Sequence, residues 1–228
     1  MKYNTLLFDL DDTLLDFEKA EEQAFFRTLN ENNINIEDGM FDRYKSINKV
    51  LWKNYEMGLI EQADLMIQRY NDLFTIYNIK KDPNHINNCY LNNLMFGNFT
   101  IDGAKEFLIN VKKDCKIYVV TNGKSKTQRK RLADSEINEL VEKIITSEEA
   151  GFRKPFKGFF DYTFKELNIS SKEKTLLIGD SLSADIKGAL DYGIDACWFN
   201  VKNKDRIDGI VPTYEAKSFS ELKTILYK

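Results

Sequence analysis

The strongest constraint on the fold is an interruption near the start of the chain. The apolar run from Leu6 to Phe8 indicates a short buried strand, and an acidic string that begins at Asp9 ends it abruptly. Over residues 16–98 apolar side chains recur at the three- and four-residue spacing of helices, with few glycines. No further strand is indicated before Lys116. We therefore expect four packed helices inserted directly after the first strand of another domain.

Beyond residue 99 the signals for strands and helices alternate. This alternation is typical of a parallel sheet that is covered by helices on both faces. The predicted strands are 116–120, 143–146, 175–178, 196–199 and a short one near Val211. The predicted helices are 125–134, 155–167, 182–192 and 218–226. The expected fold class is α/β, with a Rossmann-like parallel core formed by residues 1–15 and 99–228 and a helical insertion formed by residues 16–98.

The amino-acid composition excludes or disfavours several classes of protein. The chain has 228 residues, of which 43% are hydrophobic, so it can bury a large core and is not disordered. Its net charge of −3 suggests neither a nucleic-acid partner nor a membrane partner. Three dispersed cysteines and the single histidine, His85, favour neither a disulfide framework nor a zinc site. We expect a cytoplasmic protein with reduced thiols and no signal peptide.

Polar and charged residues gather where the predicted strands end or the following helices begin. The set comprises Asp9, Asp11, Thr121, Asn122, Lys154, Asp180 and Asp185. Because ligands bind beyond the carboxyl ends of parallel strands, we expect these side chains to meet at one edge of the sheet. At about 4 Å and an effective dielectric near 20, each pair of carboxylates repels by roughly 4 kcal/mol. Lys154 and a divalent cation could offset this repulsion, and oxygen ligands without His or Cys favour Mg²⁺.

This combination of residues predicts phosphoryl transfer to a carboxylate. Asp9 would attack phosphorus and form an aspartyl-phosphate. Asp11 would protonate the leaving oxygen and then deprotonate the attacking water. We expect Thr121, Asn122 and Lys154 to hold the phosphate, and the cation and Lys154 to neutralise charge in the transition state. The expected partner is a small phosphate monoester.

The strings that carry these residues resemble the four motifs of the haloacid dehalogenase superfamily. They read Asp9-Leu10-Asp11-Asp12-Thr13, Thr121-Asn122-Gly123, Lys154-Pro155 and Gly179-Asp180-Ser181-Leu182-Ser183-Ala184-Asp185. The resemblance covers nearly the whole chain, including an α-helical (C1-type) cap after the first motif. It implies a Mg²⁺-dependent phosphatase with Asp9 as nucleophile and Asp11 as general acid and base. It further implies that Asp9, the Asp11 backbone carbonyl and Asp180 bind Mg²⁺ directly, and that Asp185 lies behind these ligands without binding the ion itself.

Three more strings resemble the noncanonical pyrimidine 5′-nucleotidases within that superfamily. They are SEEAGFRKP at 147–155, DACWFN at 195–200 and PTYE at 212–215. This closer resemblance implies a pyrimidine nucleoside 5′-monophosphate as substrate, including modified pyrimidines. A small sugar phosphate or a phosphoglycolate-type ester is the alternative substrate. The oligomeric state is left open.

Two classes of protein other than hydrolases could carry a similar set of residues. A phospho-receiver domain also uses an acceptor aspartate, a threonine and a lysine on a parallel sheet, and an inactive binding protein could share the fold. Asp11 beside Asp9 and the long helical insertion favour hydrolysis over both. A basic run could instead mark a nucleic-acid patch, but such runs are usually solvated, so we expect a solvated helix face. The run consists of Lys124, Lys126, Arg129, Lys130 and Arg131.

Overall fold

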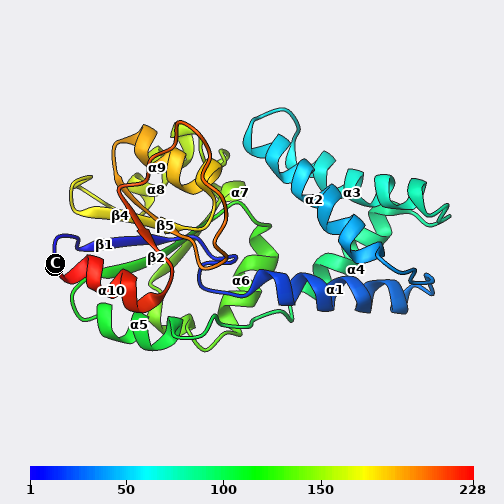
Figure 1. Ribbon diagram of the computed structural model, residues 1–228, viewed down its shortest axis with the longest axis horizontal. Coiled ribbons are helices and arrows are strands. Elements are labelled where there is room, and N and C mark those ends of the chain that lie inside the picture. Colours follow the sequence, from blue (N-terminus) through cyan, green and yellow to red (C-terminus); the bar gives the residue numbers. More distant parts are fainter. The chain divides into compact units, whose positions relative to one another are not determined.

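The computed structural model describes all residues from 1 to 228, which form two compact units (Figure 1). The first unit comprises Met1–Phe17 and Asn98–Lys228, and the second comprises Glu18–Gly97. The first is an α/β core, and the second is entirely helical. None of the helices combines the length and the apolar character that are needed to cross a membrane.

The core unit is built on one sheet of six parallel strands, ordered β3-β2-β1-β4-β5-β6. The strands are β1 (Thr5–Phe8), β2 (Lys116–Thr121), β3 (Lys143–Thr146), β4 (Thr175–Gly179), β5 (Asp195–Phe199) and β6 (Tyr214–Ala216). This is the order of a doubly wound Rossmann sheet, in which the chain proceeds from the central β1 first to one side and then to the other. The predicted fold class is therefore confirmed. Such a reversal opens a crevice beyond the carboxyl end of β1, where ligands bind in this type of sheet.

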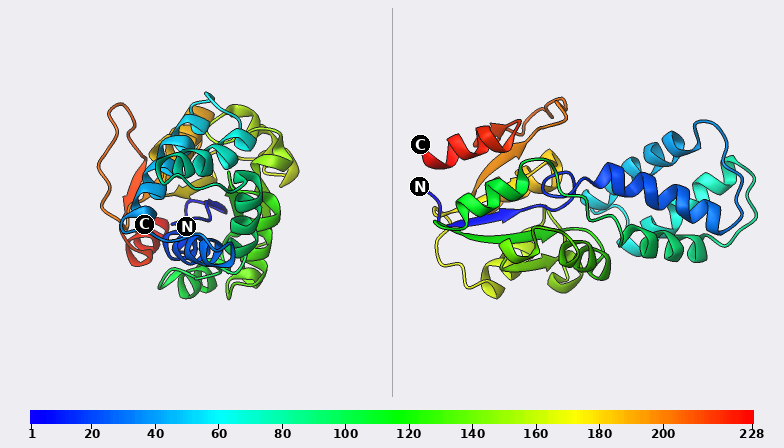
Figure 2. Two further views of the ribbon diagram at one scale, coloured as in Figure 1. Left: turned by 90° about the vertical axis from the view of Figure 1, so that its right-hand side faces the viewer. Right: turned by 90° about the horizontal axis from the view of Figure 1, so that it is seen from below.

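Helices cover both faces of the sheet (Figure 1). They are α5 (Ala104–Val111), α6 (Ser125–Ala133), α7 (Ser147–Ala150), α8 (Lys157–Glu166), α9 (Lys187–Tyr192) and α10 (Phe219–Tyr227), with a π-helical turn at Leu182–Ile186 before α9. Successive side chains of a strand point to opposite faces, so Leu6 and Phe8 join the apolar core beneath α5 and α10, while Leu7 joins the one beneath α8 and α9. The two termini of the chain lie near each other in both views of Figure 2.

The edge strand β6 and the helix α5 differ from the sequence-based prediction, and the short helix α7 was not predicted either. The short strand expected near Val211 lies three residues further along the chain: β6 begins at Tyr214, and Val211 itself is 72% exposed in a loop. The reason is that Ala216, which is fully buried, pairs with Phe199, whereas Val211 has no such neighbour in the ladder. Helix α5 was not predicted, although its four buried positions give it a clear apolar face.

The helical unit consists of four helices, as expected. They are α1 (Phe17–Glu31), whose first residue belongs to the core unit, α2 (Met40–Glu56), α3 (Gln62–Ile76) and α4 (Pro83–Leu94). Its interior is aromatic but not wholly apolar. The buried Arg69 donates hydrogen bonds to Asn87 Oδ1 (2.7 Å) and Asn48 Oδ1 (3.4 Å), and Asn48 in turn donates to Glu21 Oε1 (2.8 Å). The buried guanidinium is thus linked to a buried carboxylate through an amide.

Candidate active site

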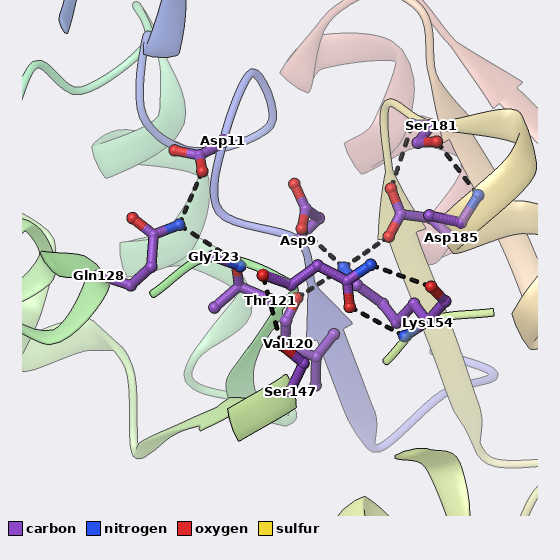
Figure 3. Close-up of polar contacts among 12 residues, drawn as sticks. Asp9, Asp11, Val120, Thr121, Gly123, Gln128, Ser147, Lys154, Ser181 and Asp185 are labelled. Carbon is purple, nitrogen blue, oxygen red and sulfur yellow. Dashed lines mark hydrogen bonds and ion pairs between the residues drawn. The ribbon is translucent and has the colours of Figure 1, made fainter. Parts of the chain in front are cut away.

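The expected residues meet at the carboxyl edge of the sheet, around the end of β1 (Figure 3). Asp9 directly follows β1, Thr121 ends β2, and Asp180 directly follows β4. These three strands are neighbours, because β1 pairs with both β2 and β4. The topology therefore explains why residues more than a hundred positions apart share one site.

Lys154 is the centre of this cluster. Its side chain is 2% exposed, and its ammonium donates hydrogen bonds to Asp9 Oδ1 (2.7 Å), Asp185 Oδ1 (2.6 Å) and the backbone oxygen of Val120 (2.8 Å). Burial alone would lower the pKa of Lys154, but the carboxylates of Asp185 and Asp9 outweigh it and raise that pKa. The Lys154 ammonium thus lies between two acids that favour its charged form.

Asn122 holds the backbone of Lys154 rather than presenting its side chain to a ligand. Its amide nitrogen donates to the Lys154 oxygen (3.0 Å), and its amide oxygen accepts from the Lys154 backbone N–H (2.8 Å). This pair of hydrogen bonds joins the segment after β2 to the segment before α8. The structure thus places Asn122 in the cluster, with a positioning contact that the sequence did not indicate.

Asp185 lies deeper than the other acids. Asp185 as a whole is 1% exposed, and its Oδ2 accepts a hydrogen bond from the Ser181 backbone N–H (3.1 Å). Gly179 makes room for it, because a Cβ at this position would lie 2.4 Å from Asp185 Cγ. The Gly-Asp-Ser string is therefore a packing requirement of the buried carboxylate as well as the end of β4.

Burial shifts the pKa of two carboxylates of this edge. It raises the pKa of Asp9 well above its usual range, although the Lys154 ammonium acts to lower it. It raises the pKa of Asp180 to about 6, although Lys204, whose ammonium forms an ion pair with Asp180, acts to lower it. Neighbouring acids add to both shifts. One lysine at each position does not fully compensate the cost of keeping these groups ionised.

Three carboxylates offer a set of oxygen atoms that could hold a divalent cation. One oxygen from each of Asp9, Asp180 and Asp185 lies within 4.8 Å of the others. Hard oxygen donors without His or Cys suit Mg²⁺, and the incomplete charge compensation favours a further cation. The residues therefore fit this ion. The Asp11 carboxylate is not part of this set.

Asp11 instead faces α6. Its Oδ2 accepts a hydrogen bond from Gln128 Nε2 (2.7 Å), and its Oδ1 forms an ion pair with Arg131 Nη1. The same Gln128 nitrogen donates to Thr121 Oγ1 (3.1 Å). Figure 3 shows Gln128 between Asp11 and Thr121. The expectation that Arg131 belongs to a solvated basic face is wrong, because its side chain is 0% exposed and is drawn inward by the Asp11 carboxylate.

Three further residues at this edge were not singled out from the sequence. They are Gln128, Lys202 and Lys204. Lys202 forms an ion pair with Asp12 (2.9 Å), and Lys204, whose backbone is bonded to Asn200, reaches Asp180. Both lysines lie in the loop between β5 and β6, far along the chain from the acids that they contact. Only the sheet topology brings them together, so no local pattern could have identified them.

Known proteins resemble this chain over its full length. The model of the haloacid dehalogenase-like hydrolases matches residues 3–193. The HAD-hydrolase YfnB of Bacillus subtilis is 40% identical over 99% of this chain and 96% of its own. Its crystal structure, described as bound to magnesium, superposes with a TM-score of 0.95 and covers 100% of both chains.

Two relatives bear the name of a more specific activity. The pyrimidine 5′-nucleotidase PynA of Streptococcus pneumoniae is 36% identical over 100% of this chain and 97% of its own. The pyrimidine 5′-nucleotidase YjjG of Escherichia coli is 28% identical over 100% of both chains. These matches confirm the superfamily resemblance found in the four motifs. The chain is an enzyme of the hydrolase class and belongs to the haloacid dehalogenase-like hydrolase family.

Proposed function

We propose that this hydrolase is a Mg²⁺-dependent phosphatase that forms an aspartyl-phosphate on Asp9. The observation that carries the proposal is the buried contact of the Lys154 ammonium with Asp9 (2.7 Å) and Asp185 (2.6 Å). The hydrogen bond from Lys154 engages Oδ1 of Asp9 and leaves the other oxygen for attack on phosphorus. A carboxylate held in this way at the carboxyl edge of the sheet suits covalent phosphoryl transfer.

The reaction divides into two steps at the carboxylates. Asp9 attacks phosphorus, its oxygen–phosphorus bond forms, and the bond from phosphorus to the ester oxygen breaks while Asp11 gives that oxygen a proton. Asp11 then takes a proton from water as the water attacks the aspartyl-phosphate, which releases inorganic phosphate and restores Asp9. Thr121 and Lys154 hold the phosphoryl oxygens, and Asn122 supports this through the Lys154 backbone.

The cation completes the charge balance of the site. When bound, Mg²⁺ would supply positive charge to the ionised carboxylates and to the phosphoryl oxygens. Asp9 and Asp180 would hold it together with the Asp11 backbone carbonyl that the family resemblance implies. Asp185 would support the site from behind, because its two oxygens accept hydrogen bonds from Lys154 and from the Ser181 backbone. The raised pKa of Asp9 and Asp180 in the absence of a cation supports this assignment.

We infer that the substrate is a pyrimidine nucleoside 5′-monophosphate. The full-length similarity to PynA and YjjG supports this inference, as do the three strings that the sequence shares with such nucleotidases. The test is phosphate release from UMP, dUMP, dTMP, a 5-halogenated dUMP, AMP, phosphoglycolate and hexose phosphates, with and without Mg²⁺. Asp9→Asn serves as the blank.

The outcomes separate the reaction from the substrate. Mg²⁺-dependent release that favours the pyrimidine nucleotides supports both parts of the proposal. Turnover of sugar phosphates or phosphoglycolate alone keeps the mechanism and overturns the nucleotide assignment. Equal activity of wild type and Asp9→Asn overturns the mechanism.

A further inference from the structure

Gln128 and Arg131 each bind one of the two oxygens of the Asp11 carboxylate. Gln128 Nε2 donates to Oδ2 (2.7 Å), and Arg131 Nη1 pairs with Oδ1. Both side chains are almost fully buried, at 2% and 0% exposure, whereas the Asp11 side chain is 28% exposed. A partly exposed carboxylate would otherwise rotate freely, so two buried donors are what restrict it.

The amide of Gln128 can act in only one orientation. Its nitrogen carries two hydrogens and donates to both Asp11 and Thr121 Oγ1 (3.1 Å), while its oxygen accepts from Arg131 Nη1 (2.9 Å). A flipped amide would set its oxygen against the Asp11 carboxylate and its nitrogen against a guanidinium that can only donate. Arg131 therefore fixes the amide as well as the carboxylate.

The local fold is shaped around this amide. Gln128 and Arg131 lie three residues apart on α6 and so share one face of the helix. Gly123 lies against the Gln128 side chain, because a Cβ there would be 2.5 Å from Nε2. A side chain at position 123 would therefore displace the Gln128 side chain from its present place.

We propose that Gln128 and Arg131 are positioning residues that aim Asp11 at the leaving-group oxygen and tie its orientation to the phosphate ligand Thr121. The inference rests on the proposed function, in which Asp11 transfers the proton. Gln128 and Arg131 contact the Asp11 carboxylate itself. They act through Asp11, so their loss should impair proton transfer to the leaving group more than nucleophilic attack.

Two kinds of phosphate ester distinguish a loss of proton transfer from a loss of nucleophilic attack. An alkyl phosphate such as UMP releases a strongly basic alkoxide and needs a proton donor, whereas 4-nitrophenyl phosphate releases a stable phenolate and needs little help. The variants are Gln128→Glu, Gln128→Met and Arg131→Lys. Lys126→Gln is the matched control, since it removes a charge from an exposed position of the same helix. Values of kcat and KM are measured for both esters at saturating Mg²⁺, and circular dichroism verifies folding.

We expect kcat for the alkyl ester to fall roughly ten- to a hundredfold more than kcat for 4-nitrophenyl phosphate, a part of the roughly 10²- to 10⁴-fold that general acid catalysis contributes. Gln128→Glu should be worse than Gln128→Met, because the same shape then presents an acceptor to the Asp11 carboxylate. Arg131→Lys should retain part of the activity, since it keeps one donor. Lys126→Gln should match wild type with both esters.

Equal losses with both esters would show a merely structural role and overturn the proposal, as would unchanged kinetics in the Gln128 variants. The activity of the wild-type enzyme tests the proposed function separately. If wild type hydrolyses other alkyl esters but not nucleotides, only the substrate assignment fails, and the comparison is made with the best alkyl ester. If wild type hydrolyses no ester, the phosphatase proposal fails and the positioning role fails with it.

Discussion

Replacing Lys154 by Met should destabilise the core unit strongly. The ammonium contacts two carboxylates and a backbone oxygen at 2.6–2.8 Å in a site where its side chain is 2% exposed. Methionine keeps much of the apolar stem, so the change removes the charge and leaves Asp9 and Asp185 buried without their partner. Removing one member of a buried ion pair costs about 3–5 kcal/mol of unfolding free energy. With a urea slope of about 2 kcal/mol/M, the unfolding midpoint should fall by roughly 2 M.

The assay is urea unfolding without Mg²⁺, followed by tryptophan fluorescence. The chain has two tryptophans, and a Trp52→Phe background leaves Trp198, which is 1% exposed in β5, as the reporter of the core unit. Lys157→Met is the matched control. Lys157 also pairs with an acid, Asp161, but its side chain is 75% exposed, so solvent screens the pair and the midpoint should barely move.

Two results would refute this reasoning. A loss of less than about 1 kcal/mol, the net value of an ordinary hydrogen bond, would mean that the carboxylates are not charged and dependent on Lys154. Similar losses in Lys154→Met and Lys157→Met would mean that burial does not decide the value of the ion pair.

Three further outcomes follow from the same physics. Burial raises the pKa of Cys115 and of Cys197 to about 12, so at pH 8 a thiol reagent such as DTNB should modify Cys89 about tenfold or more faster, and equal rates would contradict this. Burial raises the pKa of Tyr44 to about 12, above about 10 in an unfolded chain, so its contribution to stability is complete below pH 10 and is lost as the pH rises towards 12. Thermal unfolding at pH 8 and pH 11 should therefore show a smaller alkaline loss in Tyr44→Phe than in wild type. Addition of Mg²⁺ should raise Tm of wild type by a few degrees and leave Asp180→Asn unchanged, and an equal rise in both would remove Asp180 from the metal site.

Much of the fold was predictable because it depends on patterns that are local in the sequence. The buried run from Leu6 to Phe8 and the later alternation of strands and helices indicate a parallel sheet, and the helical texture of 16–98 indicates an insertion. The strand near Val211 was misplaced because a short edge strand depends on its neighbour. Ala216, with little strand preference of its own, is held in place by pairing with Phe199.

The residues of the candidate site likewise fall into those that local sequence patterns indicate and those that they do not. Residues at strand ends could be grouped because the ends of parallel strands share one edge, and the structure does bring Asp9, Lys154, Asp180 and Asp185 together there. Lys204 could not be grouped in this way. It reaches Asp180 from a loop whose course depends on the hydrogen bonds of Asn200 with the Lys204 backbone. No periodicity encodes such a contact.

Helix α6 shows where a charge pattern misleads. A run of five basic residues in eight positions suggests a solvated face, and for Arg129 and Lys130, whose side chains are 44% and 51% exposed, that interpretation is adequate. Charge alone does not reveal that the face carrying Gln128, Arg131 and Leu132 is buried. The one signal that was available is Leu132, the only leucine of this helix, because an apolar side chain indicates the face that turns inward. A buried arginine requires an acceptor, and the acid that it meets is Asp11, so the burial of Arg131 is itself an argument that this helix serves the site.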